Sequence, residues 1–155
     1  MPADPARFFL DTNILVYTFD DSTPERAAKA RELVEEALTT GRGLLSYQVI
    51  QEFLNVATTQ FATPLTVADA RTYLDRVLLP LWRVPPTADL YARALDIQAT
   101  CGYGFYDSLI VAAALVSGCR TLYSEDLQHG RRFDSLDVVN PFARGRSARE
   151  NARAT

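Results

Sequence analysis

Residues 8–19 read FFLDTNILVYTF, an apolar stretch that is interrupted by Asp11, Thr12 and Asn13. The segment Phe8–Leu10 predicts a short buried strand that ends at Asp11. A carboxylate at the end of a buried strand is costly unless it finds a hydrogen bond, a cation or a proton. Asp11 is therefore the first candidate functional residue, and its two polar neighbours offer a hydroxyl and an amide that can orient it.

Outward from this stretch, helical and strand patterns alternate along the chain. We expect further strands at residues 44–45, 81–84, 120–123 and 137–139, and helices over residues 24–40, 47–60, 66–78, 87–97 and 107–117. Strands that alternate with helices predict an α/β sandwich built on a mainly parallel sheet. The helix that begins near Asp107 is apolar on all sides, so we expect it to be central.

The composition suits a single globular domain and leaves few catalytic options. Of the 155 residues, 48% are apolar and 23% are charged, which is ordinary for a soluble protein. The longest apolar run, residues 109–116, is far shorter than the about 20 residues of a membrane span, and no signal-peptide pattern is present, so we expect a cytoplasmic protein without a membrane partner. With only one histidine, His129, and one lysine, Lys29, zinc, Ser–His–Asp and P-loop chemistry are poorly supported.

Four carboxylates lie where the expected elements should converge. Asp11 and Asp126 each follow an expected strand, whereas Glu52 and Asp107 lie near the starts of expected helices. The C-terminal ends of parallel strands gather at one edge of a sheet, where such folds bind ligands. Crowded carboxylates repel one another by about 4 kcal/mol per pair at 4 Å and an effective dielectric constant near 20. Because Mg²⁺ and Mn²⁺ prefer carboxylate oxygens, a divalent metal site is the simplest expectation.

Each candidate also has a purely structural interpretation. Asp107 and Ser46 could cap helices, Glu52 could pair with a surface arginine, and Asp126 could be a loop acid. Two other classes of site fit less well. A haloacid-dehalogenase-type phosphatase needs a second Asp where this chain has Asn13, and the segment GYGFYD lacks the third glycine of a nucleotide-binding loop.

Taken together, four segments resemble the PIN-domain nucleases, and within them the VapC-type toxins of bacterial toxin–antitoxin pairs. The segments are DTNILVY (11–17), SYQVIQEF (46–53), FYDSLIVAAALVSGC (105–119) and LYSEDLQ (122–128). The resemblance covers residues 8–142 and implies a small three-layer α/β/α sandwich with a short, mainly parallel sheet. We expect a nuclease domain over residues 1–142 and an arginine-rich, mobile tail over residues 143–155.

The resemblance implies an endoribonuclease that hydrolyses RNA phosphodiester bonds with Mg²⁺ or Mn²⁺, as the toxin of a toxin–antitoxin pair. It also implies a homodimer and a cognate antitoxin as partner. The acids that match the family's catalytic and metal-binding positions are Asp11, Glu52, Asp107 and Asp126, and the residues expected to orient them are Thr12, Asn13, Ser46 and Ser124. The family more often has Thr at the position of Ser124, and either Glu125 or Asp126 could face the site.

RNA binding needs positive charge, although the formal net charge is −3. Residues 131–155 carry six arginines against three acids, so the acidity is concentrated elsewhere. Arg131 and Arg132 are our candidates for phosphate contacts, followed by Arg120. The main alternative is a PIN-type module that binds RNA or a partner without cleaving. Metal removal separates the two, because a binding module should work in EDTA.

Overall fold

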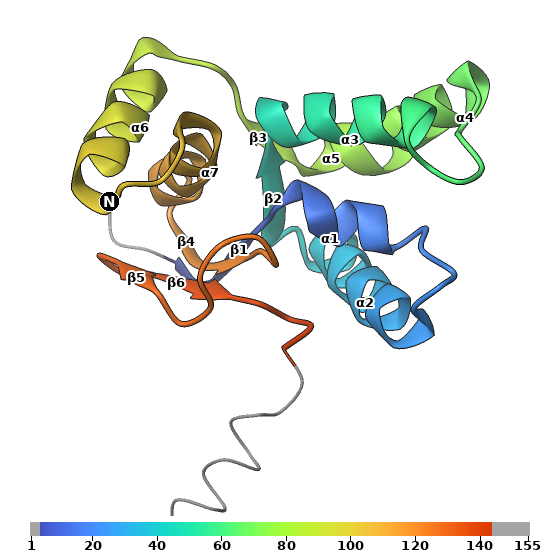
Figure 1. Ribbon diagram of the computed structural model, residues 1–155, viewed down its shortest axis with the longest axis horizontal. Helices are drawn as coiled ribbons and strands as arrows, with labels where there is room; N and C mark the ends of the chain where they lie inside the picture. The colour runs from blue at the N-terminus through green and yellow to red at the C-terminus, as the bar shows by residue number, and fades with distance from the viewer. Residues whose placement is uncertain (1–3, 144–155) are drawn as a thin grey trace, which may run out of the picture.

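A computed structural model describes residues 4–143, which form one six-stranded sheet with helices on both faces (Figure 1). The strands are β1 (Asp4–Leu10), β2 (Gly43–Ser46), β3 (Trp82–Val84), β4 (Cys119–Tyr123), β5 (Arg132–Phe133) and β6 (Leu136–Val139). The helices are α1 (Thr12–Tyr17), α2 (Pro24–Thr40), α3 (Tyr47–Thr59), α4 (Val67–Tyr73), the π-helical segment η1 (Leu74–Leu78), α5 (Leu79–Leu81), α6 (Ala88–Cys101) and α7 (Phe105–Val116). The predicted tail, residues 143–155, lies outside the described residues apart from Ala143.

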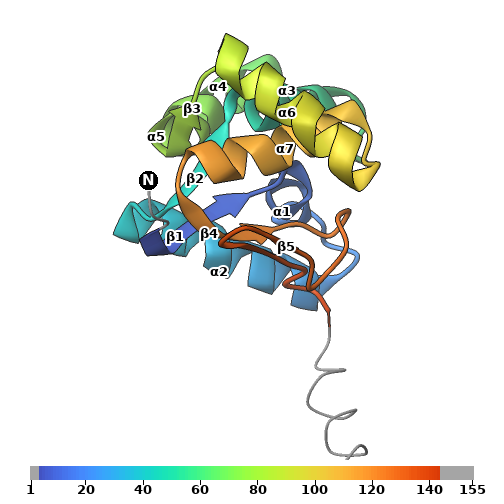
Figure 2. The same cartoon turned by 90° about the vertical axis from the view of Figure 1, so that its left-hand side faces the viewer.

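The sheet has the order β3-β2-β1-β4-β6-β5, and every strand pair is parallel except the antiparallel pair of β5 and β6. Figure 2 shows α2 below the sheet and α6 and α7 above it. These layers confirm the predicted α/β/α sandwich and its mainly parallel sheet. Strand β2 and the end of β1 are buried on both faces, which is why their sequences are short apolar runs.

Strand β1 lies in the middle of the sheet and sets the position of the candidate site. Phe8 lies opposite Gly43 of β2 and Thr121 of β4, and Leu10 lies opposite Tyr123. Phe9 and Leu10 are fully buried. The residues that follow β1 and β4 therefore emerge side by side at the same edge of the sheet, as predicted for Asp11 and the segment after β4.

Helix α2 covers one face of the sheet with the predicted spacing of small and apolar residues. Its buried residues are Ala27, Ala30, Leu33, Val34 and Ala37. The helix ends at Gly41, whose φ of 71° lies in the left-handed region that glycine adopts without strain. Gly43 makes close packing possible here, because a Cβ at this position would lie 2.2 Å from the Cβ of Ala37 and 2.6 Å from the Phe8 ring.

Helix α7 is central, as its continuous apolar sequence predicts. Every residue from Ser108 to Ala114 is buried. The helix begins at Phe105, two residues earlier than predicted, with Gly104 at the cap position. Asp107 therefore lies inside the first turn and does not cap the helix, although an acid there still favours the helix dipole.

Three elements were missing from the sequence prediction, among them the three-residue helix α5, which lies at the junction of the predicted helix over residues 66–78 and the predicted strand over residues 81–84. Helix α1 follows β1 directly, with Asp11 as its N-cap, and it spans only six residues. Strand β5 has two residues and pairs with β6. Among residues 4–143, no single helix has the length and apolarity that a membrane span requires, and only the pair α6 and α7, bent by 117° at its break, passes that test together.

Candidate active site

Asp11 lies at the junction of β1 and α1, where the backbone turns from strand to helix. Its main-chain N–H donates to the carbonyl of Tyr123 at 3.0 Å, which aligns it with the end of β4. Its Oδ1 accepts the N–H of Thr12 at 2.7 Å, and its Oδ2 accepts the hydroxyl of Ser124 at 2.7 Å. These contacts hold the carboxyl group in one orientation. The expected Thr12 hydroxyl and Asn13 amide do not take part in them, because the hydroxyl contacts Glu52 and the amide contacts Asp126.

Burial makes the Asp11 carboxyl chemically unusual. Its residue is only 7% exposed, and this burial raises its pKa to about 7. The hydrogen bonds from Ser124 and Thr12 oppose the rise, whereas the negative charges of Glu52 and Asp126 add to it. A carboxyl that is destabilised as an anion by its surroundings favours a proton or a bound cation.

Glu52 reaches the same edge of the sheet from α3. Its Oε2 accepts the hydroxyl of Thr12 at 2.6 Å, and its Oε1 accepts the side-chain N–H of Gln48 at 2.8 Å. Thr12 thus bridges two acids, because its N–H contacts Asp11 and its hydroxyl contacts Glu52. The alternative that Glu52 pairs with a surface arginine is wrong, because no arginine among the described residues forms an ion pair with it.

Gln48 is a part of the site that the sequence did not single out. It is 4% exposed and donates a second hydrogen bond, at 3.2 Å, to the main-chain carbonyl of Tyr106. It therefore connects Glu52 on α3 to the first turn of α7, next to Asp107. The predicted Ser46 occupies the N-cap position of α3, but its buried hydroxyl makes no cap bond and has no hydrogen-bond partner among residues 4–143.

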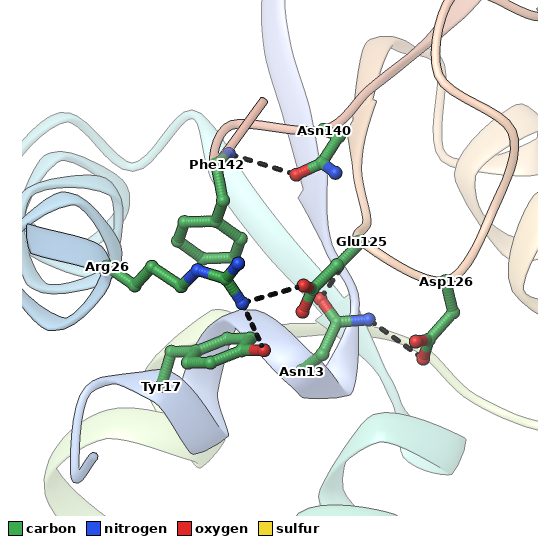
Figure 3. A network of polar contacts seen from close by, with 7 residues as sticks. All are labelled: Asn13, Tyr17, Arg26, Glu125, Asp126, Asn140 and Phe142. Carbon is green, nitrogen blue, oxygen red and sulfur yellow. Dashed lines mark hydrogen bonds and ion pairs between the residues drawn. The ribbon is translucent and has the colours of Figure 1, made fainter. Parts of the chain in front are cut away.

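Asp126 and Glu125 point in different directions (Figure 3). The Oδ2 of Asp126 accepts the side-chain N–H of Asn13 at 3.0 Å. Glu125 instead pairs with Arg26 on α2, with 3.0 Å between its Oε1 and the Nη1 of the arginine. Because only Asp126 adds its charge to Asp11 and Asp107, it is the acid of this pair that faces the cluster.

Asp107 completes the group of acids from the start of α7. Its side chain is exposed, and partial burial is the main cause of its raised pKa. The charges of Asp126 and Glu52 raise this pKa further. The four acids predicted from the sequence therefore form one electrostatically coupled set, although they come from four separate segments.

A hollow of about 580 Å³ opens beside these acids, between α1, α3 and the segment after β4. Its lining includes Asn13, Glu52 and Asp126. A neighbouring hollow of about 550 Å³ shares Val16 and Asp20 with it, so the two hollows adjoin near α1.

The carboxylates have the chemistry of a hard-cation site, although they are not drawn together. Among residues 4–143, no three acidic, histidine or cysteine side chains converge closely enough to hold a metal ion as they stand. The buried Asp11 carboxyl, with its pKa raised to about 7 and two further acids coupled to it, nevertheless fits a divalent cation. The side chains of Asp107 and Asp126 are exposed to solvent.

The predicted RNA-binding arginines occupy two different settings. Arg131 lies over the rings of Tyr103 and Phe133, with its guanidinium carbon 4.9 Å and 5.1 Å from their centres. It therefore joins the segment after β4 to the loop before α7. Arg120 and Arg132 both pair with Asp137, at 3.8 Å and 3.6 Å. Their shared partner lies on β6, and no contact with the acid cluster connects them to it among the described residues.

Comparisons with known proteins identify the family and the fold. The sequence profile of the family described as "PIN domain" matches residues 8–135. Among solved structures, a chain of a toxin–antitoxin complex from Klebsiella pneumoniae is 18% identical with a TM-score of 0.60, covering 86% of this chain and 97% of that one. The DNA-bound VapBC of Salmonella typhimurium is 19% identical with a TM-score of 0.60, covering 85% and 96%.

A third similar structure is VapC20 of Mycobacterium tuberculosis, whose description calls it a sarcin–ricin-loop-cleaving toxin. It is 18% identical with a TM-score of 0.54, covering 76% of this chain and 88% of that one. At such identities, the likeness establishes the shared fold alone. No curated protein matches the sequence.

Proposed function

The chain belongs to the PIN domain family, and from this premise we propose that it is a divalent-metal-dependent endoribonuclease that acts as the toxin of a toxin–antitoxin pair. One observation carries the proposal above all others. The carboxyl of Asp11 is buried, its pKa is raised to about 7, and the charges of Glu52 and Asp126 act both on it and on Asp107. A binding surface for RNA alone has no use for such a cluster, because it repels phosphate.

We propose that Asp11, Glu52, Asp107 and Asp126 hold Mg²⁺ or Mn²⁺. When bound, such an ion lowers the pKa of a water molecule and neutralises charge on the scissile phosphate. Hydrolysis adds the water's hydroxyl group to phosphorus, breaks the P–O3′ bond and leaves the proton on the departing 3′ oxygen. The chain's own contribution is orientation, because Thr12 and Ser124 fix the two oxygens of Asp11 while Thr12 and Gln48 fix those of Glu52.

Positive charge for the RNA backbone is proposed to come chiefly from Arg131. Its stacking on Tyr103 and Phe133 holds the guanidinium near the loop that precedes Asp107. Arg132 and Arg120 are weaker candidates, because Asp137 already neutralises part of their charge. The three similar solved chains are described as toxins or toxin–antitoxin complexes, and these descriptions support a cognate antitoxin as partner. The homodimer rests on the sequence resemblance alone.

A second candidate function is a PIN-type module that binds RNA or a partner without cleaving. It is favoured by one observation, namely that no three acids among the described residues converge at metal-binding distance. The charge coupling among the acids favours the nuclease more strongly, since ligands that repel one another commonly draw together only when a cation is present.

The test is cleavage of a structured RNA pool by the purified chain in Mg²⁺ or Mn²⁺. We expect cleavage that disappears in EDTA and in Asp11→Asn. The matched control is Asp96→Asn, which removes the same charge from an exposed position on α6 and should cleave like the wild type. Cleavage that survives EDTA or Asp11→Asn would contradict the proposed site. A folded chain that binds Mn²⁺ and RNA but cleaves nothing would favour the binding module.

A further inference from the structure

We propose that the ion pair between Arg26 and Glu125 positions Asp126 for metal binding. Arg26 and Glu125 are therefore positioning residues of the site. The proposal rests on the proposed function, because it assigns these residues a role in the same metal site. Arg26 lies outside the four motif segments, whereas Glu125 lies in the fourth one beside Asp126, and the two residues are 99 positions apart in the sequence. We refer to this pair as the Arg26–Glu125 clamp.

Arg26 makes other contacts in the clamp besides its ion pair with Glu125. The Nη1 of Arg26 donates to the Oε1 of Glu125 and to the hydroxyl of Tyr17, both at 3.0 Å. The guanidinium also lies over the Tyr17 ring, 5.5 Å from its centre. The Glu125 side chain is 25% exposed, so water screens this pair less than it screens a fully exposed one. Helices α1 and α2 are thereby joined to the segment after β4.

The clamp reaches Asp126 through Asn13. The main-chain N–H of Glu125 donates to the Oδ1 of Asn13 at 3.2 Å, and the Nδ2 of Asn13 donates to the Oδ2 of Asp126 at 3.0 Å. The first bond determines which end of the amide faces Asp126, because an oxygen held by a main-chain donor leaves the NH₂ group on the other side. Figure 3 shows Asn13 between the two acids, with Glu125 toward Arg26 and Asp126 on the far side.

The same contacts explain how one of two neighbouring acids is selected. Without Arg26, Glu125 would be an unpaired carboxylate next to Asp126, free to compete for Asn13 or for the cation. With Arg26, its charge is neutralised and its side chain is held away from the cluster. Hydrogen bonds that orient a metal ligand commonly change metal affinity or activity about 10- to 100-fold when they are removed.

The end of the described chain packs over the clamp. The ring of Phe142 meets the ring of Tyr17 edge to face, with 4.7 Å between their centres. The main-chain N–H of Phe142 donates to the Oδ1 of Asn140 at 2.9 Å, which holds this turn in place. Burial, followed by a hydrogen bond with Glu125, raises the pKa of the Tyr17 hydroxyl, so it stays a neutral donor within the cluster.

The experiment compares Arg26→Gln, Glu125→Gln and the double variant with Arg31→Gln as the matched control. Arg31 also lies on α2, and its Nε donates to the carbonyl of Thr18 at 2.9 Å, so it supports α1 without contacting the segment after β4. Mn²⁺ dissociation constants are measured by calorimetry on the full chain. Side-chain amide signals of Asn13 are followed by NMR without metal, and melting temperatures monitor folding.

We expect Arg26→Gln and Glu125→Gln each to weaken Mn²⁺ binding about tenfold or more and to move the Asn13 signals, whereas Arg31→Gln should do neither. The double variant should bind Mn²⁺ no more weakly than the single variant with the lower affinity, because both substitutions remove the same contact. Arg26→Lys keeps the charge but loses the planar guanidinium that lies over Tyr17, so its Mn²⁺ affinity should fall between those of the wild type and Arg26→Gln.

Wild-type Mn²⁺ affinity in both single variants would overturn the clamp alone. A loss of Mn²⁺ affinity in Arg31→Gln as large as in Arg26→Gln and Glu125→Gln would overturn it too. Absence of Mn²⁺ binding in every chain, wild type included, would instead overturn the metal site on which the clamp depends. If the Asn13 signals moved while the Mn²⁺ affinity stayed unchanged, the claim that Asn13 affects metal binding through Asp126 would be refuted.

Discussion

Replacing Asp11 with Asn removes a buried charge and keeps the shape of the side chain. Burial raises the pKa of Asp11 from 3.8 to about 7, so the folded chain holds this proton more tightly than the unfolded chain does. The free energy of unfolding of the metal-free protein should therefore fall as the pH rises from about 4 to about 7 and level off above that. A rise of about three pKa units at about 1.4 kcal/mol each corresponds to about 4 kcal/mol in all.

The new amide in Asp11→Asn would lose part of the hydrogen bonding of the carboxyl, but none of this loss would depend on pH. The amide oxygen can still accept the N–H of Thr12, and the amide N–H can donate to Ser124 once that hydroxyl turns. This rearrangement costs about 1 kcal/mol. Between about pH 5 and about pH 8, Asp11→Asn should gain about 3 kcal/mol of stability relative to the wild type.

The assay is urea unfolding in EDTA at these two pH values, with Asp96→Asn as the control for loss of an exposed carboxylate. Mn²⁺ at about 100 times its dissociation constant should then return about 2.7 kcal/mol to the wild type at the higher pH and leave Asp11→Asn unchanged. Parallel pH profiles for the wild type and Asp11→Asn would refute the reasoning, because they would mean that Asp11 titrates normally.

Two further predictions concern packing and orientation. Gly43→Ala should lower the free energy of unfolding, measured by thermal unfolding, by about 2–3 kcal/mol, because its Cβ would lie 2.2 Å from that of Ala37. Gly104→Ala is the control, because a Cβ there would have no atom within 4 Å, and it should change the free energy of unfolding by less than about 1 kcal/mol in the same experiment. Thr12→Val keeps the shape but removes the hydroxyl that donates to Glu52, so RNA cleavage should fall about tenfold while Thr12→Ser, at the same melting temperature, cleaves normally.

The sequence predicted those features of the fold that depend on local patterns. Strand β1, the capped helices and the central α7 each follow from apolar spacing or from residues such as Gly41. The predicted convergence of Asp11 with the segment after β4 required only that the sheet be parallel. Helix α1 could not be recognised in this way, because its six residues continue the apolar run of β1 and its only start signal, Asp11, already served as the end of the strand.

The contacts that orient the site were harder to predict because they join distant segments. Gln48 looks like an ordinary polar residue of an amphipathic helix, and its role depends on Tyr106 being brought beside it by α7. The pairing of Glu125 with Arg26 depends on where α2 lies relative to β4. A sequence alone indicates which residues can carry charge, but the three-dimensional arrangement decides which of two adjacent acids faces inward.

The most direct test of the account is a crystal structure of the chain grown with Mn²⁺, with anomalous diffraction recorded to locate the ion. The account predicts Mn²⁺ bonded to the carboxylate of Asp11, with at least two of Glu52, Asp107 and Asp126 turned toward it and Glu125 still paired with Arg26. Mn²⁺ located elsewhere, or an Asp11 carboxylate left without a metal in a chain that cleaves RNA, would contradict it.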